Sequence, residues 1–192
     1  MNAPDQTEHD LTGKMLIAMP GMEDPRFEYS VVLLCAHSVD GAMGLVVNKR
    51  VPDLSFDDLL GQLEIESGAG SQGVALHFGG PVEGARGFVL HSNDYPGAQG
   101  TMKINARFGM TATKDILVDI ARGQGPKAAL TALGYAGWGP GQLESELKQN
   151  AWLTVDGDEA IVFDADDGGK WARALRKLGI DPSMLSAGGG RA

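Results

Sequence analysis

The side chains best suited to proton transfer are the four histidines His9, His37, His77 and His91, because imidazole titrates near neutral pH without assistance. His9 lies in a polar N-terminal stretch, whereas the others are predicted at or near strand ends. Cys35 and His37 are two residues apart on a predicted strand and should share one face of it, which permits a Cys–His nucleophilic pair. A small buried thiol beside an imidazole is the favoured interpretation. Because scattered histidines lack the spacing of metal ligands, we expect neither a catalytic group nor a metal site.

The most irregular backbone is predicted at Gly79, Gly80 and Pro81. Paired glycines can adopt positive φ, and the exposed amides of such a turn can bind an anion. A tight connection between two strands is the favoured explanation of the same residues. If a ligand pocket forms beside this turn, its polar lining is expected from side chains near strand ends, namely His37, Asn48, His91 and Asp94.

Trp138 is the candidate anchor for a protein partner. It stands in a glycine-rich turn, and aromatic side chains dominate the energetics of many protein interfaces. A buried indole ring packed over the neighbouring glycines is the favoured alternative. On replacement of Trp138 with alanine, loss of a partner at unchanged stability would support the anchor, and a large loss of stability would support the buried ring.

Other glycine-rich or aspartate-rich motifs do not predict a cofactor. The stretch 68–73 has the spacing of a dinucleotide-binding fingerprint, but a strand follows it instead of a helix that could receive a pyrophosphate. The stretch 123–128 precedes a predicted helix but is entered from another helix, and Pro126 removes an amide. The stretch 164–168 begins like a calcium loop but lacks the oxygen ligands at its fifth and closing positions. We therefore expect no cofactor.

The composition favours one folded domain and argues against nucleic-acid binding. The 192 residues are 43% hydrophobic, which is enough for a core that excludes water. The formal net charge of −9 repels a phosphate backbone, so direct nucleic-acid binding is not expected. The densest basic cluster is predicted on one side of a C-terminal helix and interpreted as a solvated face beside neutralising aspartates; it comprises Lys170, Arg173, Arg176 and Lys177.

The predicted organisation has three parts. Residues 1–10 are expected to form a disordered acidic leader, residues 11–180 a single domain, and residues 181–192 a flexible tail. The leader lacks the basic start and apolar run of an export signal, and no apolar run is long enough to cross a bilayer. The single cysteine, Cys35, cannot form an intrachain disulfide. We therefore expect a cytoplasmic protein without membrane association. The sequence does not identify a protein partner or an oligomeric state.

The elements that would position these residues mix strands and helices. Strands are predicted at 13–20, 29–37, 44–48, 74–78, 86–91, 108–112 and 133–138. The pair Asp40-Gly41 is typical of a hairpin, and Ser55 is typical of a helix N-cap. Helices are expected over 55–63, 113–122, from Pro126, over 142–150 and over 169–178, and a late hairpin is expected to join strands at 152–155 and 160–163.

Four segments, taken together, resemble the YqgE/AlgH family. They are 11–20 (LTGKMLIAMP), 44–48 (GLVVN), 78–82 (FGGPV) and 134–147 (GYAGWGPGQLESEL). The last is the most specific, because a string of glycines around Tyr135 and Trp138 followed by an acidic helix is hard to obtain from composition alone. The resemblance extends from about residue 11 to residue 179.

The resemblance implies an α+β fold with a mixed, partly barrel-like β-sheet and peripheral helices. It implies a bacterial family without an established enzymatic reaction, named after a proposed role in transcriptional regulation of alginate production, and it carries no catalytic residues across. The first hypothesis is therefore a regulatory or interaction protein that acts through its folded surface and indirectly on transcription. The alternative is a small-molecule-binding protein or enzyme with a pocket near Gly79-Gly80-Pro81, and of these two the non-enzymatic function is favoured.

Overall fold

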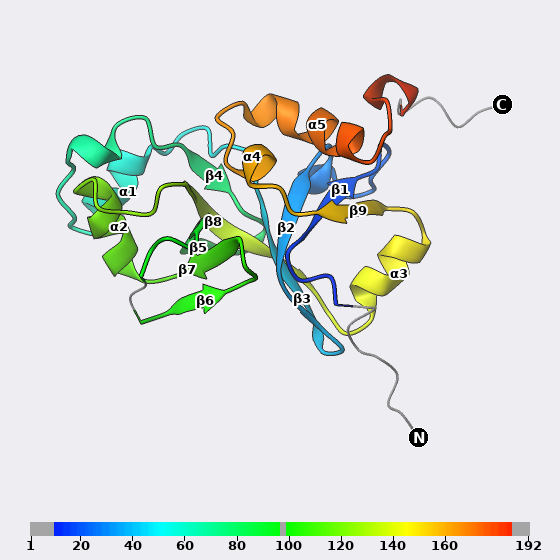
Figure 1. The fold of residues 1–192 in the computed structure, drawn as a ribbon, viewed down its shortest axis with the longest axis horizontal. Helices are drawn as coiled ribbons and strands as arrows, with labels where there is room; N and C mark the ends of the chain where they lie inside the picture. The colour runs from blue at the N-terminus through cyan, green and yellow to red at the C-terminus, as the bar shows by residue number, and fades with distance from the viewer. Residues whose placement is uncertain (1–9, 97–98, 186–192) are drawn as a thin grey trace.

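A curled sheet of nine strands is the framework of the computed structural model, which describes residues 10–96 and 99–185 (Figure 1). In chain order its strands are β1 (Lys14–Ala18), β2 (Val31–Ser38), β3 (Gly41–Val46), β4 (Leu76–Phe78), β5 (Val82–Ser92), β6 (Thr101–Lys103), β7 (Phe108–Thr111), β8 (Ala129–Trp138) and β9 (Trp152–Asp156). Within the described residues they are ordered β6-β7-β5-β8-β3-β2-β1-β9 across the sheet, each antiparallel to its neighbour, and β4 pairs with β8 in parallel.

Five short α-helices in the described residues surround this sheet. They are α1 (Phe56–Gln62), α2 (Lys114–Ala121), α3 (Gln142–Lys148), α4 (Glu159–Val162) and α5 (Lys170–Lys177). Helices α1 and α2 lie at one end of the molecule, α3 at the other, and α4 and α5 along one side (Figure 1). The predicted N-cap is confirmed: Ser55 Oγ accepts from the Asp58 amide at 3.0 Å, and the Asp58 carboxylate accepts from the Ser55 amide at 3.0 Å. In the described residues no helix has the length and apolar character needed to cross a membrane.

Apolar residues of β2 are buried on both faces of the sheet, because helices cover both. Val31 and Leu33 enter the main core with residues of α4 and α5, whereas Val32 and Leu34 enter a second core with residues of β9 and α3. A third core lies between α1, α2 and the strands β4 and β5. This two-sided burial explains why the strand is a continuous apolar run in the sequence and not an alternating one.

Three sequence predictions about the helices and strands and their exposure are wrong. The helix expected from Pro126 is absent; the chain enters β8 at Ala129 instead, since its position between β5 and β3 overrides the helical preference of its alanines and leucines. The strand expected at 160–163 is the helix α4. Asp158 is its N-cap, and the Asp158 carboxylate accepts from the Ala160 amide at 2.9 Å. The third concerns Lys170, which is fully buried and not on a solvated face.

Most residues of the predicted leader and tail are not among the residues that the structure describes. Residues 1–9 and 186–192 are not among the described residues. Asp10 is exposed, and Leu185, within the predicted tail, packs against the main core. The division into leader, domain and tail stays a prediction.

Candidate functional site

A groove opens where side chains of the main core reach the surface. The β2–β3 hairpin and the strand β6, which border it, lie on the side of the molecule away from α4 and α5 (Figure 1). The groove has a volume of about 760 Å³ and lies between the tip of the β2–β3 hairpin and the strands β5, β6 and β8. We call it the core-end groove; the large apolar side chains that line it are Met43, Val82, Phe88, Met102, Met110, Tyr135 and Trp138. Methionine side chains adapt to different apolar partners, so this lining can fit more than one shape.

Arg86 supplies a cation beside this apolar lining. Its guanidinium carbon lies 5.1 Å from the centre of the Phe88 ring, which is within the range of a cation–π contact. Its Nη1 lies 3.4 Å from Glu83 Oε2, and both side chains are more than half exposed. Because an exposed ion pair of this kind is weak, Arg86 can readily exchange Glu83 for a carboxylate of another molecule.

His37 lies at the edge of the core-end groove, but both of its ring nitrogens are occupied. Nδ1 accepts from the Leu11 amide at 3.0 Å, which places the ring proton on Nε2, 2.6 Å from Glu144 Oε1. The hydrogen bond from His37 is the largest cause that lowers the pKa of Glu144. With a side chain that is 5% exposed, His37 joins the start of the chain to α3.

The expectation that Cys35 and His37 share one strand face is wrong. The register between β2 and β3 shifts between Leu34 and Ala36, and such a bulge breaks the alternation of side chains. Cys35 enters the main core, whereas His37 reaches α3. Burial raises the pKa of Cys35 to about 12, so the thiol is not activated as a nucleophile.

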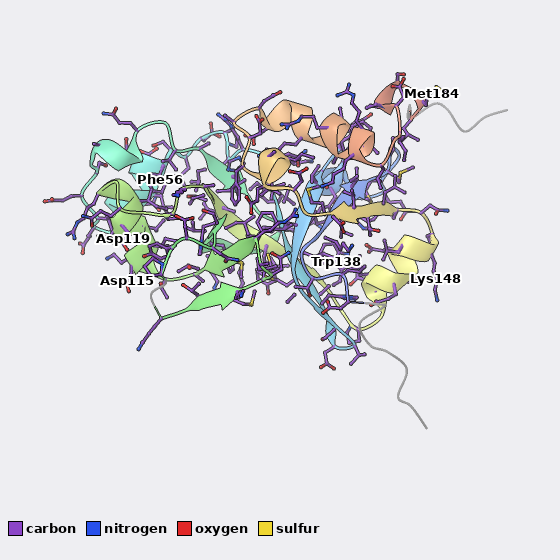
Figure 2. All side chains as sticks on the ribbon, in the orientation of Figure 1. Phe56, Asp115, Asp119, Trp138, Lys148 and Met184 are labelled. Atoms are coloured by element: carbon purple, nitrogen blue, oxygen red, sulfur yellow. The ribbon has the colours of Figure 1, made fainter. Side chains whose placement is uncertain are left out.

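A second cavity, of about 350 Å³, is lined by Phe27, Trp152 and Trp138. Trp138 also lines the core-end groove. Trp138 lies at the end of β8, on the side of the sheet that α3 covers (Figure 2). The indole nitrogens of Trp138 and Trp152 both donate to Glu146 Oε2 at 2.8 Å. Trp138 is 7% exposed, so it is a mostly buried ring. We call the second cavity the aromatic cavity; Pro81 also lines it.

The turn at Gly79 and Gly80 is a close crossing over β8. A Cβ atom at Gly79 would lie 2.3 Å from the Gly134 carbonyl oxygen, and one at Gly80, where φ is +157°, would lie 2.0 Å from the Tyr135 carbonyl carbon. The Gly79 amide donates to Leu133 O at 2.8 Å, so that amide is not free to bind an anion. Of this turn, Pro81 reaches the aromatic cavity.

Asn48, His91 and Asp94 line neither cavity. Asn48 Oδ1 accepts from the Val31 amide and its Nδ2 donates to Tyr29 O, both at 2.9 Å, so its amide extends the backbone pairing at the start of β2. His91 is buried, and its Nε2 lies 2.8 Å from Thr111 Oγ1. Asp94 accepts from the Lys127 amide at 2.9 Å and fixes a turn.

A family model described as AlgH-like (DUF179) matches residues 15–183. The chain belongs to the AlgH-like family. UPF0301 proteins are similar in sequence. The one from Paracoccus denitrificans is 57% identical over 190 residues, which cover 98% of this chain and 100% of the relative. The one from Ruegeria pomeroyi is 59% identical over 184 residues, which cover 95% of this chain and 100% of the relative. The predicted family is therefore confirmed.

Solved structures support the same conclusion. The solution structure of AlgH from Pseudomonas aeruginosa is 40% identical, with a TM-score of 0.78, and covers 100% of this chain and 99% of that one. A crystal structure of a Corynebacterium diphtheriae protein has a TM-score of 0.70 at 21% identity, over 92% and 88% of the two chains, and bears on the fold alone. The AlgH-like chain thus has the expected α+β fold, with a curled, half-barrel sheet and few helices.

The AlgH-like chain also holds an ionic cluster, buried except for Arg50, that sequence reasoning missed. Lys170 Nζ donates to Asp167 Oδ1 and to Val47 O, each at 2.8 Å. Asp167 also accepts from Arg50 Nε at 2.6 Å and from His77 Nε2 at 3.0 Å. These donors outweigh its burial and lower the pKa of Asp167 to about 2. Burial lowers the pKa values of His77 and Lys170.

This ionic cluster fixes α5 to the sheet. Its members come from segments far apart in the sequence, with His77 in β4, Arg50 after β3 and Lys170 in α5. A cavity of about 240 Å³ lies beside Arg50 and His77, and His77 Nδ1 is buried without a hydrogen-bond partner in the described residues. The one available sequence signal was the spacing of Asp167 and Lys170, which places an acid and a base one helical turn apart.

Proposed function

We propose that this AlgH-like chain is a regulatory or interaction protein that binds a partner protein in the core-end groove. The observation that carries the proposal is the uncovered end of the main core: Met102 is 36% exposed and Val82 is 37% exposed, beside the partly buried Met43 and Tyr135. An apolar surface of this kind, with charged groups at its edge, is typical of a protein-binding site.

The partner we infer presents an apolar segment with a carboxylate near its end. Methionines at 43, 102 and 110 give the groove an adaptable apolar floor. Arg86 stands at the edge with one long contact to Glu83, so it can pair with an acidic side chain of the partner at little cost. Charge complementarity of this type selects the partner and orients it.

A regulatory effect on transcription would then be indirect. The net charge of −9 opposes contact with a phosphate backbone. One of the four residues of the predicted basic cluster, Lys170, is buried and paired with Asp167. The proposal places the protein in the cytoplasm, where a single buried thiol such as Cys35 stays reduced. Failure to bind duplex DNA at low salt would agree with this indirect role.

Photo-crosslinking inside the protein's own cells tests the proposal. A photoreactive amino acid is placed at position 102, on β6 in the groove, and in a matched control at Met184, which is 78% exposed and does not line the groove. We expect a discrete protein adduct from position 102 that is absent from position 184. Adding Arg86→Glu should abolish the adduct, because the change reverses the charge at the edge.

The outcomes separate the possible occupants of the groove. An adduct of one partner protein, lost with Arg86→Glu, supports the proposal. An adduct with twice the mass of the chain would identify a second copy instead, and an adduct with a small molecule would favour a ligand pocket. Equal adducts from positions 102 and 184 would show contact without a specific site.

A second candidate function is small-molecule binding in the aromatic cavity. The specific observation is that Pro81, from the predicted Gly79-Gly80-Pro81 turn, lines the same cavity as Trp138. This cavity is smaller than the groove and within the size range of ligand pockets. Two carboxylates line it, those of Asp24 and Glu146, and Asp24 is paired with Arg26. The aromatic walls and the carboxylate of Glu146 indicate which ligand the cavity would accept.

A further inference from the structure

We propose that the aromatic cavity binds an organic cation of the methylated-ammonium class. This inference rests on the second candidate function and names its ligand. A cation–π site needs aromatic surfaces on more than one side and a cavity that fits the ammonium group. Both are present here, and a carboxylate lies at the same place.

Three aromatic rings form walls of the cavity, and the ring of Trp152 packs edge-to-face with each of the other two. The rings of Trp138 and Trp152 are 6.0 Å apart at 76°. The rings of Phe27 and Trp152 are 5.8 Å apart at 74°. Because Trp152 is steeply inclined to both neighbours, the three rings form a corner and not a flat stack, and all three line the same cavity.

Glu146 gives the cavity its negative charge. Its Oε2 accepts from the indole nitrogens of Trp138 and Trp152, and its Oε1 accepts from Gln142 Nε2 at 3.1 Å. Among the residues that the structure describes, no Lys, Arg or His lies within ion-pair distance of this carboxylate. The hydrogen bonds come from neutral groups, so they fix the carboxylate without cancelling its charge.

Arg26 also lines the cavity, but its charge is already matched. Arg26 Nη2 donates to Asp24 Oδ2 at 2.7 Å, and Nε donates to both oxygens of Asp24 at 3.0 and 3.1 Å. This planar pairing is the strong form of an arginine–carboxylate contact. The Arg26–Asp24 pair is therefore close to neutral, and the net charge facing the cavity is that of Glu146.

These features favour a methylated ammonium over other ligands. Glu146 and the aromatic faces both attract a positive charge. The two indole N–H groups are engaged with Glu146 and are not free to bind an anion. A bulky cation without N–H donors loses little hydration on entry, which suits walls made of carbon.

Choline and its neutral isostere 3,3-dimethylbutanol provide a matched pair of probes. The readout is the indole N–H signals in nitrogen–proton correlation spectra of the full chain, recorded at constant ionic strength. The chain has three tryptophans; Trp171 donates to Ala18 O and does not line the cavity, so its signal is an internal control. We expect saturable shifts of Trp138 and Trp152 with choline, and binding about tenfold weaker, or ~1.4 kcal/mol, with the isostere.

Two variants and one control test the origin of the preference. Glu146→Gln keeps an oxygen for the indoles but removes the charge, and Phe27→Leu keeps an apolar wall but removes a ring. Each should weaken choline binding several-fold while the isostere binds as before. Glu66→Gln removes an exposed carboxylate that does not line the cavity and should leave choline binding unchanged.

Three results would overturn the inference: equal binding of choline and the isostere, no shift of Trp138 or Trp152 at tens of millimolar choline, or unchanged choline binding in Glu146→Gln. Unfolding of a variant is recognised from the Trp171 signal, and the wild-type comparison of the two probes decides the inference without any variant. Crosslinking at position 102 is a separate readout, because Met102 lines the groove and not the aromatic cavity. Failure here is thus distinguishable from failure of the proposed partner binding.

Discussion

Replacing Asp167 with asparagine tests whether the buried ionic cluster stabilises the fold. The Asp167 side chain is 10% exposed, and that of Lys170 is fully buried. Lowering the pKa of Asp167 from 3.8 to about 2 corresponds to about 2 kcal/mol of stability at neutral pH. The variant also leaves Lys170 without a counter-charge, and an uncompensated buried charge typically costs ~3–5 kcal/mol. We expect a loss of ~3 kcal/mol, at the lower end of this range, because asparagine can still accept one hydrogen bond.

The pH dependence identifies the cause of this loss. Since the folded pKa of Asp167 lies below the unfolded value, its stabilisation is present above pH 3.8 and disappears as the pH falls through about 2. The difference between wild type and Asp167→Asn should therefore shrink over this window. Urea unfolding of both proteins at several pH values measures it.

Two further variants make the test specific. Asp166→Asn changes an exposed neighbour and should alter the free energy of unfolding by less than about 0.5 kcal/mol. Adding Lys170→Met to Asp167→Asn removes the stranded charge and should recover part of the loss. A neutral-pH loss below about 1 kcal/mol for Asp167→Asn, or a loss independent of pH, would refute the reasoning.

Three other experiments have defined outcomes. Gly80→Ala places a Cβ 2.0 Å from the Tyr135 carbonyl carbon and should lower the melting temperature strongly. The control Gly84→Ala places a Cβ where no atom lies within 4 Å and should leave the melting temperature unchanged. Equal melting temperatures of the two variants would contradict the close crossing of Gly80 over β8. Trp138→Ala should cost ~3–5 kcal/mol in urea unfolding, and a loss under about 1 kcal/mol would indicate an exposed ring. Cys35, with its pKa raised to about 12 by burial, should react with a disulfide reagent at neutral pH only in unfolding concentrations of urea; fast labelling of the folded chain would show that the thiol is accessible.

Local patterns predicted much of the fold. The capping pattern at Ser55 and the hairpin at Asp40-Gly41 depend on neighbouring residues, so the sequence contains their causes. Predictions failed where distant pairing decides the outcome. The segment after Pro126 has helical composition, but its place between β5 and β3 makes it the strand β8. The bulge in β2, which separates Cys35 from His37, has no glycine or proline to announce it.

The candidate sites were predictable only in part. Trp138 and Pro81 were singled out separately, and the structure brings them to one cavity. Their partners Phe27 and Trp152 come from segments that only the fold places there. The core-end groove could not be predicted, because its apolar residues look like ordinary core positions until the sheet curls and leaves one end uncovered.

Native mass spectrometry of the untagged chain, gently purified from its own cells, tests partner binding at the core-end groove most directly. Wild type is compared with Met102→Glu, which places a charge in the groove at a residue that is already 36% exposed and tolerates a polar side chain. The account predicts a protein partner retained by wild type and a bare chain for the variant. Retention of the same partner by both proteins would contradict it.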